Sequence, residues 1–214
     1  IQQNGYNQFD SYWAARNRVL IDPAHFKREE PVWLEIGAGT GGFFEQMAKH
    51  HPDRFLIAIE RCKVRAQALT KRITRAALPN LVGYRGNAVP ALIHGVPTAS
   101  VERLYILYPC PWPKNSQRRN RWYLHPIMPH LVRSLKNDGL LIWASDQKFY
   151  IDEARFVCES IFGMRILAHG EIQPNAYNSL EFFEGGRTKF ERTFLESGQP
   201  CYELVAQPAS QIGR

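Results

Sequence analysis

Short apolar runs alternate with segments of helical spacing through the first three quarters of the chain. The runs at 32–36, 55–60, 81–85, 103–107 and 140–145 are nearly continuous, which predicts strands buried on both faces. Between and after them we expect helices at 42–52, 61–78 and 88–95, in a segment ending near 136, and at 149–162. This alternation predicts a doubly wound, mostly parallel α/β sheet.

The last part of the chain has a different pattern. Residues 188–197 and 200–206 flank Gly198 and Gln199, which predicts an antiparallel hairpin at the edge of the sheet. No linker, repeat or low-complexity tract divides the 214 residues, so we expect a single domain over 1–214, with 1–30 as an N-terminal extension. The expected architecture is that of Rossmann-like class I methyltransferases, with a C-terminal antiparallel hairpin.

A glycine-rich turn follows the first predicted strand. Residues 37–42 read GAGTGG, which lets the backbone turn tightly and approach a ligand at a helix N-terminus. Glu60 ends the second strand, where a carboxylate can accept hydrogen bonds from ribose hydroxyls. Glu35 suits the ammonium group of S-adenosylmethionine (SAM), whereas it would repel the pyrophosphate of a dinucleotide. The predicted cofactor is therefore SAM, with Asn87 after the third strand at its adenine.

Charge is distributed unevenly along the chain. The net charge is +7, but residues 61–137 hold 14 of the 27 Lys/Arg residues and only one of the 20 Asp/Glu residues. In the helix predicted at 61–78, apolar residues take one face and leave cations for the others. A nearly acid-free stretch of this length favours a surface that faces a polyanion such as RNA, although a solvated basic face is the simpler alternative.

The cysteines and the chain start indicate the cellular setting. Cys62, Cys110, Cys158 and Cys201 form no CxxC pair, so we expect reduced thiols, no structural zinc and a cytoplasmic protein. The polar start lacks the features of a signal peptide, and no apolar stretch approaches the roughly 20 residues of a membrane span.

The loop after the fourth predicted strand carries the most specific motif. Residues 108–122 read YPCPWPKNSQRRNRW, which is too stiff and too charged for a simple connector. Arg118, Arg119 and Arg121 can neutralise phosphates, and Trp112 or Trp122 can stack a splayed base or pack in the core.

This loop resembles the FPDPWxK-plus-basic segment of bacterial tRNA (guanine-N7)-methyltransferases. The resemblance extends from LEIGAGTGG to TKFERTFLESG and includes ASDQKFY at 144–150 and TKFE at 188–191. It implies SAM against Glu35, Glu60, Asn87 and the loop, and tRNA as the partner of a monomer or homodimer. The tRNA contacts that it implies, together with the arginines above, are Lys114, Arg118, Arg119, Arg121, Asp146, Thr188, Lys189, Phe190 and Glu191. The full set of expected cofactor-binding residues is Glu35, Gly37, Gly39, Gly41, Glu60, Asn87 and Cys110.

Two positions depart from the family pattern. The carboxylate between the two prolines is Cys110 here, and the acid after the third strand is Asn87. Guanine N7 attacks with a lone pair and needs alignment more than a base, but a carboxylate would stabilise its cationic product better than a neutral thiol does. Cys110 is therefore the predicted catalytic position. Two alternatives stay open: a cytosine carbon-5 methyltransferase that uses the Cys110 thiolate as nucleophile, and a weak or silent RNA-binding paralogue.

Overall fold

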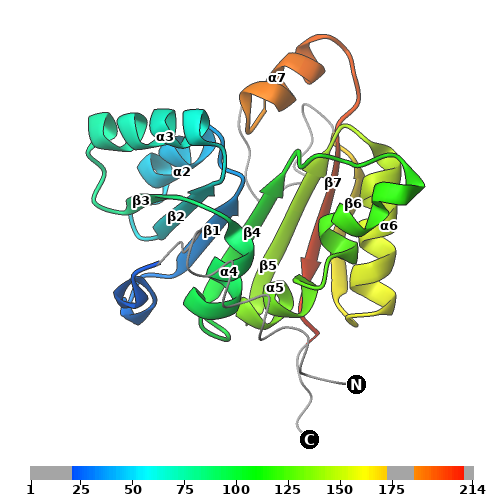
Figure 1. The fold of residues 1–214 in the computed structure, drawn as a ribbon, viewed down its shortest axis with the longest axis horizontal. Coiled ribbons are helices and arrows are strands. Elements are labelled where there is room, and N and C mark those ends of the chain that lie inside the picture. Colours follow the sequence, from blue (N-terminus) through cyan, green and yellow to red (C-terminus); the bar gives the residue numbers. More distant parts are fainter. Residues whose placement is uncertain (1–20, 173–185, 210–214) are drawn as a thin grey trace, which may run out of the picture.

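A seven-stranded sheet forms the centre of the computed structural model, which describes residues 21–172 and 186–209 (Figure 1). The strands lie in the order β3-β2-β1-β4-β5-β7-β6. Neighbouring strands from β3 to β5 are parallel, and β7 is antiparallel to both β5 and β6. The bounds are β1 (Val32–Ile36), β2 (Phe55–Glu60), β3 (Leu81–Arg85), β4 (Val101–Leu107), β5 (Leu135–Ser145), β6 (Arg165–Glu171) and β7 (Tyr202–Gln207).

Helices cover both faces of this sheet, and every residue of β1 and β2 is buried between them. On one face, α2 (Gly42–His50) and α3 (Lys63–Ala76) pack against side chains such as Trp33 and Leu56. On the other, α5 (Met128–Ser134), α6 (Lys148–Ser160) and the turn α4 (Ala88–Pro90) with η3 (Ala91–Gly95) pack against residues such as Leu34. The short 3-10 helices are η2 (Pro23–Lys27), η4 (Asn115–Asn120) and η5 (Trp122–Leu124). The predicted doubly wound, mostly parallel class is confirmed.

The predicted hairpin over 188–197 and 200–206 is wrong. Residues Lys189–Glu196 form a helix, α7, above the carboxyl ends of β4 and β5 (Figure 1). Thr188 caps this helix by accepting a hydrogen bond from the Glu191 amide, and Phe190 stacks on Phe194 one turn later. The T-x-x-E capping pattern and the i, i+4 aromatic pair are helix signals that outweigh the strand propensity of the segment. The antiparallel partners of β7 are β5 and β6.

In the described part of the chain, no helix combines the length and apolar content that crossing a membrane requires. Nor do the described His, Cys, Asp and Glu residues form a group of three that could hold a metal ion.

Candidate functional site

A cavity of about 830 Å³ opens at the carboxyl ends of β1, β2 and β4. Its walls include Gly37 and Glu60 on one side, Asn87 after β3, and Cys110 and Trp112 in the loop after β4. Parallel strands place their carboxyl ends at one edge of the sheet, so residues far apart in sequence meet there. This cavity therefore brings together the glycine turn, the second-strand acid and the proline-rich loop.

The glycine turn reaches the cavity at Gly37, and its first two glycines have open space beside them. Gly37 and Gly39 have φ values of 80° and 57°, and no atom lies within 4 Å of where a Cβ would stand. Gly41 also has a positive φ, but a Cβ there would lie 2.3 Å from Leu69 Cδ1. Gly37 and Gly39 therefore leave room for a ligand, whereas Gly41 lets α2 pack closely on α3.

Glu60 organises the rim of the cavity. Its Oε2 accepts a hydrogen bond from the Gly39 amide (2.8 Å), and its Oε1 accepts one from the Cys62 amide (2.6 Å). The carboxylate is buried, yet it lines the cavity. Each carboxylate oxygen can accept a further hydrogen bond, so Glu60 suits a ligand with paired hydroxyl groups.

Glu35 lies in β1 and is buried beneath the cavity, not in its wall. Its Oε2 has no hydrogen-bond partner among the described residues. Burial, with a smaller contribution from the charge of Glu60, raises the pKa of Glu35 from an ordinary 4.5 to about 8. An uncompensated buried acid is costly, so this position fits a site whose ligand brings positive charge nearby.

Asn87 combines a structural role with a place in the cavity wall. Its Oδ1 accepts a hydrogen bond from the Val89 amide (3.1 Å) and so caps α4. The side-chain amide nitrogen is left as the donor that can serve a ligand.

The loop after β4 has a strained backbone at two aromatic residues. Tyr108 and Trp112 have φ values of 51° and 47°, a conformation that costs about 1–3 kcal/mol for such residues. Between them, Cys110 is exposed and lines the cavity. Trp112 and Trp122 line it too, and Trp122 also packs against the core.

Arg121 is not available to phosphates, contrary to the prediction. It is 3% exposed, and its guanidinium donates to the carbonyls of Trp112 and Pro113 and forms an ion pair with Glu153 (2.7 Å). Arg121 therefore anchors the proline-rich segment to α6.

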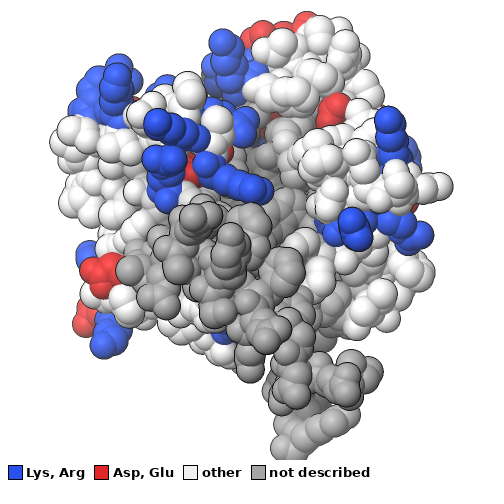
Figure 2. Space-filling view, in the orientation of Figure 1, with Lys and Arg blue, Asp and Glu red and all other residues white. Residues whose placement is uncertain are grey.

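Three predicted cations of the loop stay on the surface. Lys114, Arg118 and Arg119 are all exposed, and no ion pair within the described residues engages them. Figure 2 shows Lys and Arg atoms on this side of the molecule and again over α3. These three side chains remain candidates for contact with a polyanion.

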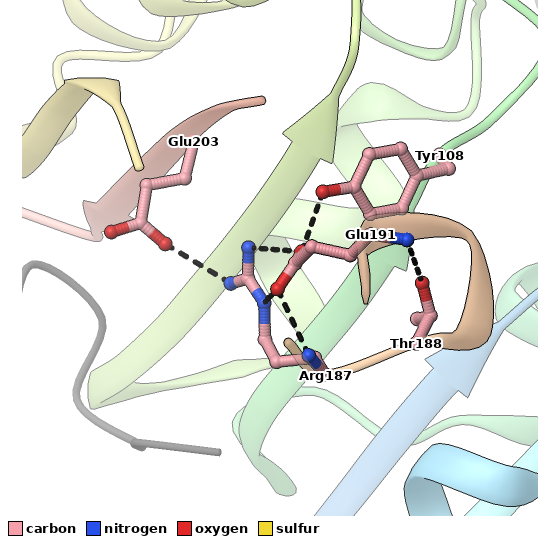
Figure 3. A network of polar contacts seen from close by, with 5 residues as sticks. All are labelled: Tyr108, Arg187, Thr188, Glu191 and Glu203. Atoms are coloured by element: carbon pink, nitrogen blue, oxygen red, sulfur yellow. Dashed lines mark hydrogen bonds and ion pairs between the residues drawn. The ribbon is translucent and has the colours of Figure 1, made fainter. Parts of the chain in front are cut away.

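A buried ionic network lies under α7 (Figure 3). Arg187 donates to Glu191 Oε2 (2.9 Å) and to Glu203 Oε2 (3.0 Å), and the Tyr108 hydroxyl donates to Glu191 Oε2 (2.5 Å). Burial alone would raise the pKa of Glu191, but the charge of Arg187 and the hydrogen bonds from Arg187 and Tyr108 together more than offset it, and the pKa is lowered. Burial raises the pKa of Glu203, and Arg187 opposes the shift. The network thus ties the loop after β4 to α7 and β7.

The predicted substrate residue Glu191 therefore belongs to this network, where it is 2% exposed and fully engaged. Its neighbours differ. Lys189 and Phe190 are exposed on α7, and Thr188 caps the helix. Asp146 is half-buried after β5 and accepts a hydrogen bond from the Gln147 side chain (2.6 Å).

Tyr108, Arg187 and Glu203 were not singled out from the sequence. One signal was present: Glu203 is the only charged residue in YELVA, an otherwise strand-like apolar run, and an acid there needs a buried cation. Nothing in the sequence identified Arg187 as that cation.

The chain resembles known proteins both in sequence and in fold. A family described as "putative methyltransferase" matches residues 29–204. A tRNA (guanine-N7)-methyltransferase of Alcanivorax borkumensis is 31% identical over 205 residues, which cover 93% of this chain and 83% of the relative. One from Thermotoga maritima is 27% identical over 85% of this chain, which spans 55% of that relative. A crystal structure of the 16S rRNA methyltransferase KamB is 16% identical with a TM-score of 0.63, covering 89% of this chain and 95% of that one, which shows the shared fold.

Proposed function

Because the chain belongs to the tRNA (guanine-N7)-methyltransferase family, we propose that it methylates N7 of a guanosine in tRNA, with SAM as methyl donor. The observation that carries this proposal is the single cavity bordered by Gly37, Glu60, Asn87 and the Cys110 loop. A tRNA substrate favours a cytoplasmic enzyme, and the oligomeric state that we propose is a monomer or homodimer.

The residues present fit SAM. When bound, SAM supplies an electrophilic methyl group on a sulfonium. Glu60 would receive the ribose hydroxyls, and Asn87 would face the adenine. Glu35 lies outside the wall and, with a pKa of about 8, keeps its proton at neutral pH; a bound methionine ammonium would favour its ionised form through the electric field rather than by contact.

The chain's own task in the reaction is alignment. Guanine N7 has no proton to lose, so no general base is needed, and rate comes from holding the lone pair in line with the methyl group. The rigid PCPW segment, anchored by Arg121 and Tyr108, would place the base, with Trp112 available to stack on it. Lys114, Arg118 and Arg119 would bind phosphates beside it, and Asp146, Thr188, Lys189 and Phe190 would form the opposite rim.

The direct test is incubation of the purified protein with tRNA and SAM, followed by nuclease digestion and mass spectrometry. We expect 7-methylguanosine. Cys110→Asp should maintain or raise its formation, because a carboxylate stabilises the cationic product, and Cys110→Ser should reduce it only modestly. No methylated guanosine with any tRNA would contradict the proposal and favour a silent RNA-binding protein.

The exposed Cys110 in the cavity wall favours one second candidate, cytosine carbon-5 methylation. In that reaction the thiolate adds to pyrimidine carbon 6, the methyl group joins carbon 5, and loss of the carbon-5 proton expels the thiolate. RNA containing 5-fluorocytidine would then trap the protein as a gel-stable adduct, and both Cys110 variants would be inactive. The guanine proposal expects no adduct and active variants.

Binding of the cofactor can be tested separately. Glu60→Ala should weaken SAM binding by about 10–150-fold in calorimetry, the equivalent of roughly 1.5–3 kcal/mol for a charge-assisted hydrogen bond. Glu45→Ala is a control, because Glu45 is an acid of α2 paired with Lys49 and Arg72. Unchanged SAM affinity in Glu60→Ala, or a preference for NAD, would contradict the assigned site.

A further inference from the structure

The exposed side of α3 carries a row of cations. Arg72 and Arg75 follow Arg65 at 7 and 10 positions along α3, a spacing that puts these three on one helix face, and Arg61 lies just before the helix, next to its N-cap residue Cys62. Lys71, one turn before Arg75, lies beside this row. At about 1.5 Å per residue, the helical part of the row, from Arg65 to Arg75, is roughly 15 Å long.

Most of these cations are not used within the molecule. Arg72 donates to the Thr40 carbonyl and pairs with Glu45 (2.6 Å), so it is engaged. Arg65 reaches Glu60 only at 3.4 Å and is 61% exposed. Arg61, Lys71 and Arg75 are exposed and form no ion pair within the described residues. The sequence has no acid between residues 61 and 101, so their charge is not neutralised locally.

The row begins at the cavity. Arg61 and Arg65 line it on the side of Glu60, while Asn120 and Trp122, next to the exposed arginines of η4, line it from the loop. Figure 2 shows Lys and Arg atoms both over α3 and on the side of the loop, and residues from both of these regions line the cavity. If a tRNA base entered the cavity, the sugar-phosphate backbone on either side of it would pass both sets of cations.

We propose that Arg61, Arg65, Lys71 and Arg75 form a second RNA-binding surface, which holds the tRNA backbone on the side of the cavity opposite η4. This inference rests on the proposed function and extends it. The ligand chemistry is phosphate along a strand, because a row of cations without acids recognises charge and spacing rather than sequence. Val64, 72% exposed within the row, can contact the sugars.

The test uses the double variant Lys71→Ala/Arg75→Ala, because neither residue lines the cavity. Each lost phosphate contact should lower tRNA affinity by about tenfold at 0.1 M salt and reduce the slope of log K against log salt by about one. In turnover, the KM for tRNA should rise while kcat and SAM affinity stay unchanged.

The matched control is Lys49→Ala/Arg155→Ala, which removes two exposed cations that are ion-paired on α2 and α6. Its salt slope should equal that of the wild type. An unchanged slope in the α3 variant, or an equal loss in both variants, would overturn the inference. A wild type that methylates tRNA while the α3 variant is unaffected refutes only this inference, whereas a wild type that neither binds nor methylates tRNA refutes the proposed function.

Discussion

The arginines of η4 and the arginine beneath α7 carry the same charge in opposite environments. Arg118 and Arg119 are exposed and have no ion pair within the described chain. Arg187 is buried between Glu191 and Glu203, at 2.9 and 3.0 Å. A buried cation needs carboxylates to compensate for its lost hydration, whereas an exposed one keeps water and remains available to a ligand. Charge alone therefore does not identify the proposed RNA-facing residues; exposure and the lack of a close internal partner are what favour them.

Arg121 shows how sharply the two environments can alternate. It follows Arg119 by two residues, yet its guanidinium is buried against two carbonyls and Glu153. Its exposed neighbours can face RNA because Arg121 keeps the segment in place.

The largest effect is expected for Arg187→Met. It leaves two acids buried without their cation, so the free energy of unfolding should fall by about 3–5 kcal/mol in urea titrations. Arg119→Met, the matched exposed change, should stay within about 0.5 kcal/mol of wild type. A similar loss in both variants would erase the distinction between the two regions.

The next largest loss of stability is expected for Tyr108→Phe. It removes the hydroxyl that donates to Glu191, a hydrogen bond to a charged group worth roughly 1.5–3 kcal/mol. Burial, together with the charge of Glu191, raises the pKa of Tyr108, so the hydroxyl keeps its proton and remains a donor. Tyr84→Phe, which loses a hydrogen bond to His25 (2.7 Å), should cost only about 0.5–1.5 kcal/mol. Equal losses of stability in the two variants, measured by thermal unfolding, would mean that the charge of Glu191 does not strengthen its hydrogen bond with Tyr108.

A comparison of Arg121→Ala with Arg118→Ala distinguishes a role in anchoring the loop from a role in binding RNA. Leaving the carbonyls of Trp112 and Pro113 without this donor should cost about 1–3 kcal/mol of stability. Arg118→Ala should leave stability unchanged but reduce the salt slope of tRNA binding by about one. If Arg118→Ala instead destabilised the protein, its exposed position would be in doubt.

Glu35 extends the comparison to a buried acid without a cation, and its expected effect depends on pH. Because its folded pKa of about 8 lies above the ordinary 4.5, the folded state holds a proton that the unfolded state releases between these values. Stability should therefore be highest below about pH 4.5 for this group, fall by at most about 1.4 kcal/mol per pH unit up to pH 8, and then level off. Glu35→Gln should remove this component of the slope in urea titrations across the range. An identical pH profile in the variant would show that Glu35 is ionised in the folded protein.

The sequence was sufficient to predict the elements whose signal is local. The predicted parallel strands agree with the structure to within two residues, except that β5 begins at Leu135, five residues before the predicted start, where the pattern predicts the end of a helix. Gly37, Glu60, Asn87 and Cys110 meet in one cavity because strand ends converge. The sequence was insufficient for charged residues whose role depends on whether they are buried. Arg118 and Arg121 look alike in NSQRRNRW, and only the packing of the loop on α6 separates them. The helix at 189–196 was missed because Thr188 was not recognised as a cap, and the partners of Glu191 come from distant segments.

The position of β7 inside the sheet has a consequence for how the protein is made. β7 lies between β5 and β6, and β6 has no other strand neighbour in the described chain. During synthesis, β6 therefore leaves the ribosome before the strand that it pairs with, and β5 keeps an open edge until Gln207 has emerged. Open strand edges are sites of wrong pairing and aggregation. Arg187, Glu191 and Glu203 come from the same late segment, so the loop that carries Cys110 gains its support from α7 only in the final stage of folding.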